Sequence, residues 1–198
     1  MTEWYRNTDW SPEIAGSFEA RIARGRTQKA QHLSLQGQAL VARHPKVARG
    51  LLERAVAMND EFETPRATAF LAQAQLALGE VDAALDTYEA ALERQLAQPN
   101  MIAVQPVDYL FLVGYFERAV RLPAAEPLAD ALQDDGIFGP DPQLNAARSL
   151  VYNLAKRRND AARHAALALP LMAEMPEVSA LGIDIGDLRR RLEAIAAD

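Results

Sequence analysis

Apolar residues recur along this chain three and four positions apart, which is the spacing of one face of an α-helix. Ile14, Phe18 and Ile22 give an early example, and the same spacing returns within residues 188–195. No segment of useful length alternates apolar and polar residues, as a half-buried strand does. The pattern therefore predicts an all-α fold. Helices are expected at about 27–43, 45–58, 65–78, 81–97, 106–121, 124–132, 161–173 and 187–197, with two more beginning at Pro12 and Pro142.

Capping residues and prolines mark several of the expected helix ends. Ser11-Pro12 and Asp141-Pro142 each combine an N-cap side chain with a proline at the first helical position. His44-Pro45 separates two helices, because the residue before a proline is pushed out of the helical region. Pro123 is expected to end the helix at 106–121, and Asp187 to cap the last helix.

A longer pattern occupies residues 65–97. In a tetratricopeptide repeat a helix, a tight turn and a second helix fill roughly 34 residues, with small residues where the helices cross. The positions that match this motif are Leu71, Ala72, Gly79, Ala84, Tyr88 and Ala91. A frame 36 residues earlier places Leu35, Ala48, Leu52 and Ala55 at matching positions. The chain thus resembles the tetratricopeptide-repeat family, which implies antiparallel helical hairpins stacked into a right-handed solenoid.

The resemblance organises residues 1–198 as one repeat domain. An aromatic segment and capping helix (1–26) precede two tetratricopeptide-like hairpins (27–100) and two degenerate hairpins (101–175). A capping helix (176–198) closes the array, since repeat arrays need a polar-backed end. The aromatic opening, Trp4–Trp10, and the following Arg24–Lys29 also resemble a group of small bacterial repeat proteins with no established activity.

Composition narrows the classes of partner. The chain has no cysteine and no long apolar run, so disulfides and a membrane span are not expected, and a reducing cytoplasm is the default location. The net charge is −6, but residues 55–145 carry 15 acidic and 4 basic residues, a net −11. Such a region repels nucleic acid and attracts a basic partner. The simpler alternative is a solvated acidic face.

Family resemblance implies binding of a protein or peptide in a groove lined by the first helix of each hairpin. Among the groove-facing positions of the two hairpins, only Arg66 and Gln73, both in the second hairpin, could contact a carboxylate. The other positions are Ala30, Leu33, Gly37, Leu40 and Val41 in the first hairpin, and Ala69, Leu76 and Ala77 in the second. A mostly apolar groove favours a partner helix or loop over a carboxylate terminus.

The aromatic residues at the N-terminus have two interpretations. Trp4, Tyr5 and Trp10 either cover the open end of the array or anchor a partner, since aromatic residues are enriched at binding hot spots. Covering the array is the favoured interpretation.

Candidate chemistry is weak throughout. The histidines His32, His44 and His164 lack the i, i+4 spacing of a helical zinc site, and no phosphate-binding or nucleophile motif occurs. Carboxylate pairs such as Asp82/Asp86 have helical spacing, as most surface acids do. No metal, cofactor or catalytic residue is therefore expected.

We expect a non-enzymatic protein-interaction module, either a dedicated inhibitor of the immunity-protein type, binding a basic partner such as a toxin domain, or an adaptor. The predicted partner-binding residues are Trp4, Tyr5, Trp10, Arg66, Gln73, Glu80, Asp82, Asp86, Glu89 and Tyr109. The chain is expected to be a monomer or a dimer. An enzyme with an unfamiliar helical site and a self-assembling structural repeat are the alternatives.

Overall fold

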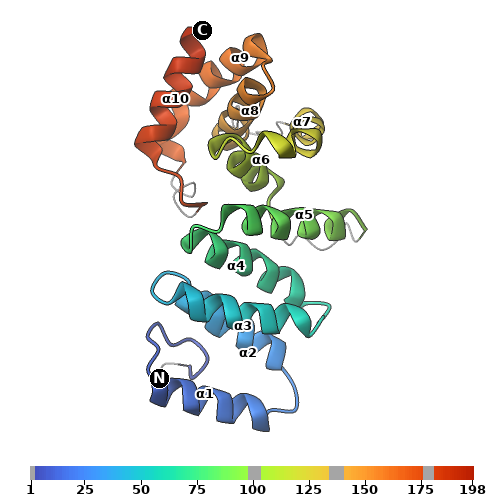
Figure 1. Ribbon diagram of the computed structural model, residues 1–198, viewed down its shortest axis with the longest axis vertical. Helices are drawn as coiled ribbons and strands as arrows, with labels where there is room; N and C mark the ends of the chain where they lie inside the picture. The colour runs from blue at the N-terminus through green and yellow to red at the C-terminus, as the bar shows by residue number, and fades with distance from the viewer. Residues whose placement is uncertain (1–2, 98–103, 134–140, 176–180) are drawn as a thin grey trace. The chain divides into compact units, whose positions relative to one another are not determined.

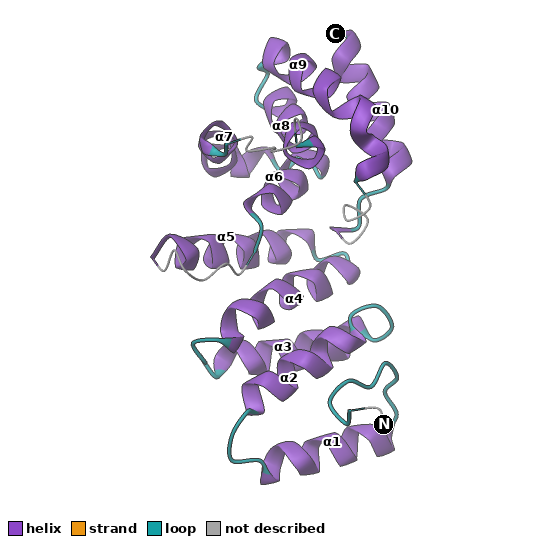
Figure 2. Ribbon diagram, turned by 180° about the vertical axis from the view of Figure 1, so that it is seen from behind, coloured by secondary structure: helices purple, strands orange, loops and turns teal. Residues whose placement is uncertain are grey.

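The computed structural model describes residues 3–97, 104–133, 141–175 and 181–198. Every regular element in these ranges is helical (Figure 2), which confirms the predicted all-α class. The chain divides into two compact units, Met1–Val104 and Gln105–Asp198, here called unit 1 and unit 2. Their boundary falls close to residue 100, where the two regular hairpins were expected to end. A single solenoid running through both units stays a prediction.

Unit 1 contains a lone helix followed by two helical hairpins (Figure 1). Its helices are α1 (Pro12–Arg24), α2 (Lys29–Leu40), α3 (Pro45–Ala57), α4 (Glu63–Ala77) and α5 (Val81–Ala97). Within each hairpin α2 packs on α3 and α4 on α5, and the hairpins meet through α3 and α4 and through α2 and α4. This is the consecutive pairing that the repeat pattern predicts.

The motif residues of the second hairpin lie where its two helices cross. Ala72 and Ala84 have no exposed surface, and Tyr88 is also buried. Gly79 adopts φ +75°, and the Glu80 N–H donates to the Gln75 carbonyl at 2.9 Å. That bond is the signature of a Schellman turn, which requires the left-handed conformation that glycine adopts readily. The predicted tight turn at Gly79 is thus confirmed.

Polar bonds in unit 1 join residues about one repeat apart. Arg54 donates to Glu19 at 2.6 and 3.0 Å, 35 residues away, and Arg94 donates to Asn59 at 3.2 Å, also 35 residues away. Arg49 donates to both oxygens of Glu80, 31 residues away. The repeat period read from the apolar residues is therefore repeated in the side-chain bonds.

Unit 2 is less regular. It contains α6 (Pro106–Tyr115), the 3-10 helix η1 (Ala119–Arg121), α7 (Leu122–Ala131), α8 (Pro142–Leu154), α9 (Arg158–Ala168), the 3-10 helix η2 (Leu169–Glu174) and α10 (Ile185–Ala197). α8 packs on α6 and α9, and α10 packs mainly on α9. Leu188, Leu192 and Ile195 form the buried side of α10, as predicted.

Several predicted boundaries in unit 2 were wrong. The helix expected at 106–121 ends at Tyr115, because the chain turns through Glu117 at φ +54°. Pro123 does not end that helix but stands in the first turn of α7, where its missing N–H costs nothing. The helix expected from residue 161 begins at Arg158. Asp184, not Asp187, caps α10, and its carboxylate accepts the Asp187 N–H at 2.6 Å.

Helices α6 and α8 approach each other closely at Gly114. A Cβ at that position would lie 2.6 Å from Cβ of Leu150 and 3.1 Å from its backbone carbon. Every residue of α6 from Tyr109 to Gly114 is buried. This helix is therefore apolar on more than one side because it lies between neighbouring helices.

Candidate partner-binding surface

The predicted acidic residues gather on and beside α5. Asp82, Asp86 and Glu89 follow one another at i, i+4 and i+7, which places them on one face of that helix, and Glu93 continues the row. Asp82 and Asp86 are exposed and Glu89 is half-buried. Glu80, just before the helix, is held by Arg49, whose Nη1 lies 2.6 and 2.8 Å from its two oxygens. We call Asp82, Asp86, Glu89 and Glu93 the acidic row.

A groove of about 320 Å³ runs beside the acidic row. Its lining comes from three helices: Val56 of α3; Pro65, Thr68 and Leu71 of α4; and Asp86, Thr87, Ala90, Ala91 and Arg94 of α5. The Thr87 hydroxyl donates to Gln75 Oε1 at 2.8 Å, which ties α5 to α4 along this wall. The groove is thus mostly apolar, with Asp86 shared between it and the acidic row.

The two polar groove residues predicted on α4 lie two helical turns apart on a partly exposed side. Arg66 forms an ion pair with Glu63, and its Nε is buried without a hydrogen-bond partner in the described part of the chain. Gln73 is half-buried. The Arg66 guanidinium is therefore already paired with a carboxylate of the chain itself and is less available to a carboxylate of a partner.

The structure contradicts the groove that was predicted for the first hairpin. Ala30, Leu33, Gly37 and Leu40 are buried, and Val41 packs against the core. A Cβ on Gly37 would lie 2.6 Å from Leu52 Cγ, so this position faces α3. Leu33 and Leu40 belong to the same apolar cluster as Phe18 of α1, so no open groove remains there.

The N-terminal aromatic residues pack onto unit 1, in line with the favoured interpretation. Trp4, Tyr5 and Trp10 are half-buried against the apolar cluster. The rings of Trp4 and Tyr5 lie 4.7 and 4.6 Å from the ring of His32, and burial there lowers the pKa of that histidine. Gln36 also exchanges bonds with Asn7, donating to its carbonyl at 2.7 Å. These contacts give the segment a packing role without assigning a partner.

Tyr109 is not available to a partner. It is only 1% exposed and begins the buried stretch of α6 that runs from Tyr109 to Gly114. Its inclusion among the predicted binding residues was wrong, because this stretch is covered by the protein's own core.

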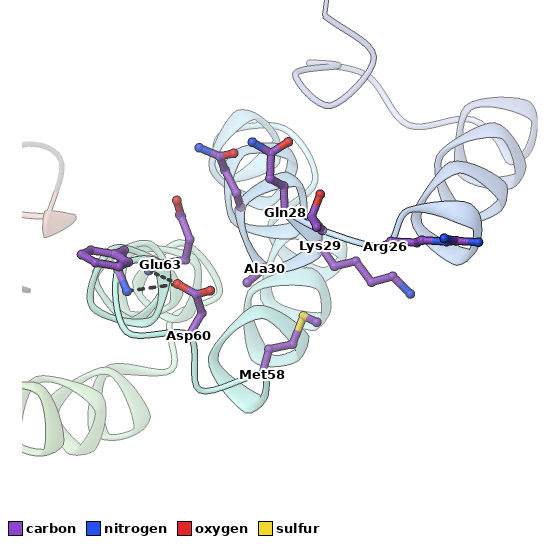
Figure 3. Close-up of a pocket in the computed structure, with 10 residues that line it drawn as sticks. Arg26, Gln28, Lys29, Ala30, Met58, Asp60 and Glu63 are labelled. Atoms are coloured by element: carbon purple, nitrogen blue, oxygen red, sulfur yellow. Dashed lines mark hydrogen bonds between the residues drawn. The ribbon is translucent and has the colours of Figure 1, made fainter.

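A second hollow, of about 440 Å³, was not predicted. It lies where α2 begins and where the chain passes from α3 to α4. Figure 3 shows Arg26 and Lys29 on one side, Asp60 and Glu63 on the other, and Ala30 and Met58 between them. The sequence did hold a signal for it: Phe62, an aromatic residue between two glutamates in a connecting segment, which is an unusual place for a core residue.

Unit 2 carries a polar cluster on α7, α8 and α9. Tyr152 donates to Asp130 Oδ1 at 2.8 Å, and Arg157 Nη1 lies 3.0 Å from both oxygens of Asp130. Burial, followed by the bond to Asp130, raises the pKa of Tyr152 to about 12. The same bond lowers the pKa of Asp130. Tyr152 and Arg157 thus bond from α8 and from the start of α9 to Asp130 of α7, and this arrangement suits a structural link.

The described residues contain no group of three or more histidine, cysteine, aspartate or glutamate side chains able to hold a metal ion. His32, His44 and His164 contact different partners: the aromatic rings of Trp4 and Tyr5, Asp9, and Asn145. Within the same ranges, no helix has the length and apolar character that a membrane crossing requires.

Comparison with known proteins adds no relative. No protein-family model matches this chain, and no curated protein and no solved structure matches it significantly. The likeness to tetratricopeptide repeats therefore rests on the motif residues and on the helical pairing described above.

Proposed function

We propose that this protein is a non-enzymatic binding module that holds a basic partner protein on the α5 side of unit 1. The observation that carries the proposal is the juxtaposition of the apolar groove with the acidic row. An apolar slot lets a partner side chain be buried, and the adjacent carboxylates speed encounter with a positively charged surface.

The type of partner follows from the charge distribution. Asp82, Asp86, Glu89 and Glu93 share one helix with a single basic residue, Arg94, whose guanidinium is bonded to Asn59. A basic face with a protruding apolar side chain complements this surface. Masking such a face is what a dedicated inhibitor of a basic protein, such as a toxin domain, does. We therefore favour an inhibitor of the immunity-protein type over a general adaptor.

The test compares bait variants in a pull-down from a bacterial lysate. Asp82→Lys/Asp86→Lys reverses two charges of the acidic row, and Glu193→Lys/Asp198→Lys reverses two exposed charges of unit 2 as the matched control. A basic protein retained by the wild type and by the control, but lost with the first variant, supports the proposal. Its binding should weaken steeply between 50 and 200 mM salt, on the scale of the ~8–10 Å Debye length.

A second pair of variants tests the groove. Ala90→Trp fills the groove on α5, and Ala166→Trp adds the same side chain to an exposed position of α9. Only the first should weaken binding of the captured partner, by about tenfold or more. Binding that resists both the filled groove and the reversed charges would rule out this surface. Turnover of a substrate by the purified chain would rule out a non-enzymatic module.

A further inference from the structure

The hollow at the start of α2 exposes large apolar side chains. Phe62 is 77% exposed and Met58 is 46% exposed, and both line the hollow with Ala30. Apolar surface of this kind, rimmed by charge, marks places where another macromolecule packs. The hollow is separate from the groove beside the acidic row, which lies among α3, α4 and α5 and shares no lining residue with it.

The charges around the hollow are divided into two halves of opposite sign. Arg26 and Lys29 form the basic half, and neither side chain has a hydrogen bond or an ion pair with another described residue (Figure 3). Asp60 and Glu63 line the opposite side, and the exposed Glu61 lies between them in sequence. The Glu63 side chain is 14% exposed and is paired with Arg66, so Asp60 and Glu61 carry the accessible negative charge of this half. Asp60 accepts the backbone N–H groups of Phe62 and Glu63, which fixes this acidic half at the start of α4.

A partner with charge of only one sign would be attracted by one half of the hollow and repelled by the other. A second copy of the same surface, turned by a two-fold rotation, presents its acidic half to the basic half and its basic half to the acidic half. Such a self-complementary patch is what an isologous dimer interface requires. We propose that two copies of this chain associate through this hollow as a two-fold dimer.

In the dimer Phe62 of each copy packs on the exposed Met58 of the other. Arg26 and Lys29 of each copy face residues 60–63 of the other. The apolar contact buries surface that is exposed in one copy alone, and the charges fix the orientation of the two copies. This inference does not depend on the proposed function, because it uses a different surface.

The experiment measures sedimentation of the full chain from micromolar concentration to about 1 mM. One variant reverses the basic half, Arg26→Glu/Lys29→Glu, and another reverses the acidic half, Glu61→Lys/Glu63→Lys. Each alone should weaken self-association at least tenfold, because like charges then face each other across the two-fold axis. An equimolar mixture of the two variants should form mixed dimers, since each supplies the charges that the other lacks.

Two further variants separate this interface from general effects of charge and folding. Arg43→Glu/Lys46→Glu reverses two exposed charges of unit 1 outside the hollow and should leave the dimer intact. Phe62→Ser removes the exposed ring, costs the fold little and should weaken the dimer at least tenfold. Circular dichroism verifies that each variant is folded. The proposal is overturned by a wild type that stays monomeric at about 1 mM, by unchanged dimers in the reversed or Phe62 variants, or by folded reversed variants that fail to pair when mixed.

Discussion

The two compact units bury different kinds of residue. In unit 1 the core is an apolar cluster that includes Phe18, Leu40 and Leu52, and its buried polar residues are neutral. In unit 2 the buried set includes Arg148 and His164. The regular hairpins are thus held by matched apolar side chains, whereas the irregular unit adds directed bonds from charged or titratable groups. Small residues still allow close helix packing in unit 2, as at Gly114, and directed polar bonds such as those of Arg148 add to that packing.

The largest effect is expected in the apolar core of unit 1. Leu52 is fully buried in the cluster against which Trp4 and Trp10 also pack. Leu52→Ala should lower the free energy of unfolding by about 3 kcal/mol, because it leaves a cavity. Both tryptophans of the chain lie in unit 1, so tryptophan fluorescence during urea unfolding reports on this unit alone. Leu96→Ala, at a position 84% exposed, is the control and should change little.

A somewhat smaller effect is expected from the buried charge of unit 2. Arg148 Nε donates to the Ala129 carbonyl at 2.9 Å, and Nη2 donates to the carbonyl of Leu132, so this side chain holds the end of α7. Arg148→Met keeps an unbranched apolar stem but removes the guanidinium that these carbonyls accept from. The loss should be about 2 kcal/mol.

Far-UV circular dichroism detects this change and tests the independence of the units. Arg148→Met should shift the part of the transition due to unit 2 and leave the tryptophan signal unchanged. Arg158→Met, on the exposed surface of α9, serves as the control. An equal shift of both signals would show that the units unfold together, and the contrast between them would then describe one cooperative core.

The smallest effect concerns the pH dependence of unit 2. Tyr152→Phe removes the bond to Asp130, in a cluster that also contains Arg157, Glu126, Arg148 and His164. The difference in unfolding free energy between wild type and this variant should be about 1 kcal/mol near neutral pH. The raised pKa of Tyr152 means that its contribution is complete below pH 10 and is lost as the pH rises through about 12.

At acid pH the dependence of stability on pH has the opposite sign. Folding lowers the pKa of Asp130, so its contribution is present above the ordinary aspartate pKa of 3.8 and is lost as the pH falls through the folded pKa. The difference in unfolding free energy between wild type and Tyr152→Phe should therefore be constant at intermediate pH and should decrease towards both low and high pH. Chemical unfolding from pH 3 to pH 11 measures it. A difference that does not vary with pH would mean that the tyrosine acts by packing alone.

The sequence predicted the regular hairpins well because local signals and packing agree there. At the Ala72–Ala84 crossing, small side chains let the two helices pack closely. At Gly79, glycine adopts the positive φ that the turn requires. The helix boundaries of unit 2 were harder to predict because the turn after α6 places Glu117 at positive φ. Glutamate seldom adopts that conformation, so its presence in the sequence does not indicate a turn. Tyr109 shows a second limit: an apolar helix surface looks the same in sequence whether a partner or the protein itself covers it.

The candidate surface was predicted in part. The acidic row could be read from charge and helical spacing, because both are local properties. The groove beside it could not, since its lining joins Val56, Leu71 and Ala91 from three helices, and only their packing leaves the space between them. Gly37 was placed on a groove by analogy with other repeats, but its missing side chain makes room for Leu52.

The bonds between residues one repeat apart have a consequence for how this chain can change length. Glu19–Arg54 and Asn59–Arg94 each span 35 residues, and neither depends on a residue farther along the chain. A duplicate of the segment from the start of α2 to the residue before α4 would carry Arg54 and Asn59 but neither Glu19 nor Arg94, so the added hairpin would lack these bonds. The array can therefore change length by a whole hairpin and keep this pairing only where the partner residues are supplied as well, and an insertion of a few residues within a hairpin would misalign the existing pairs.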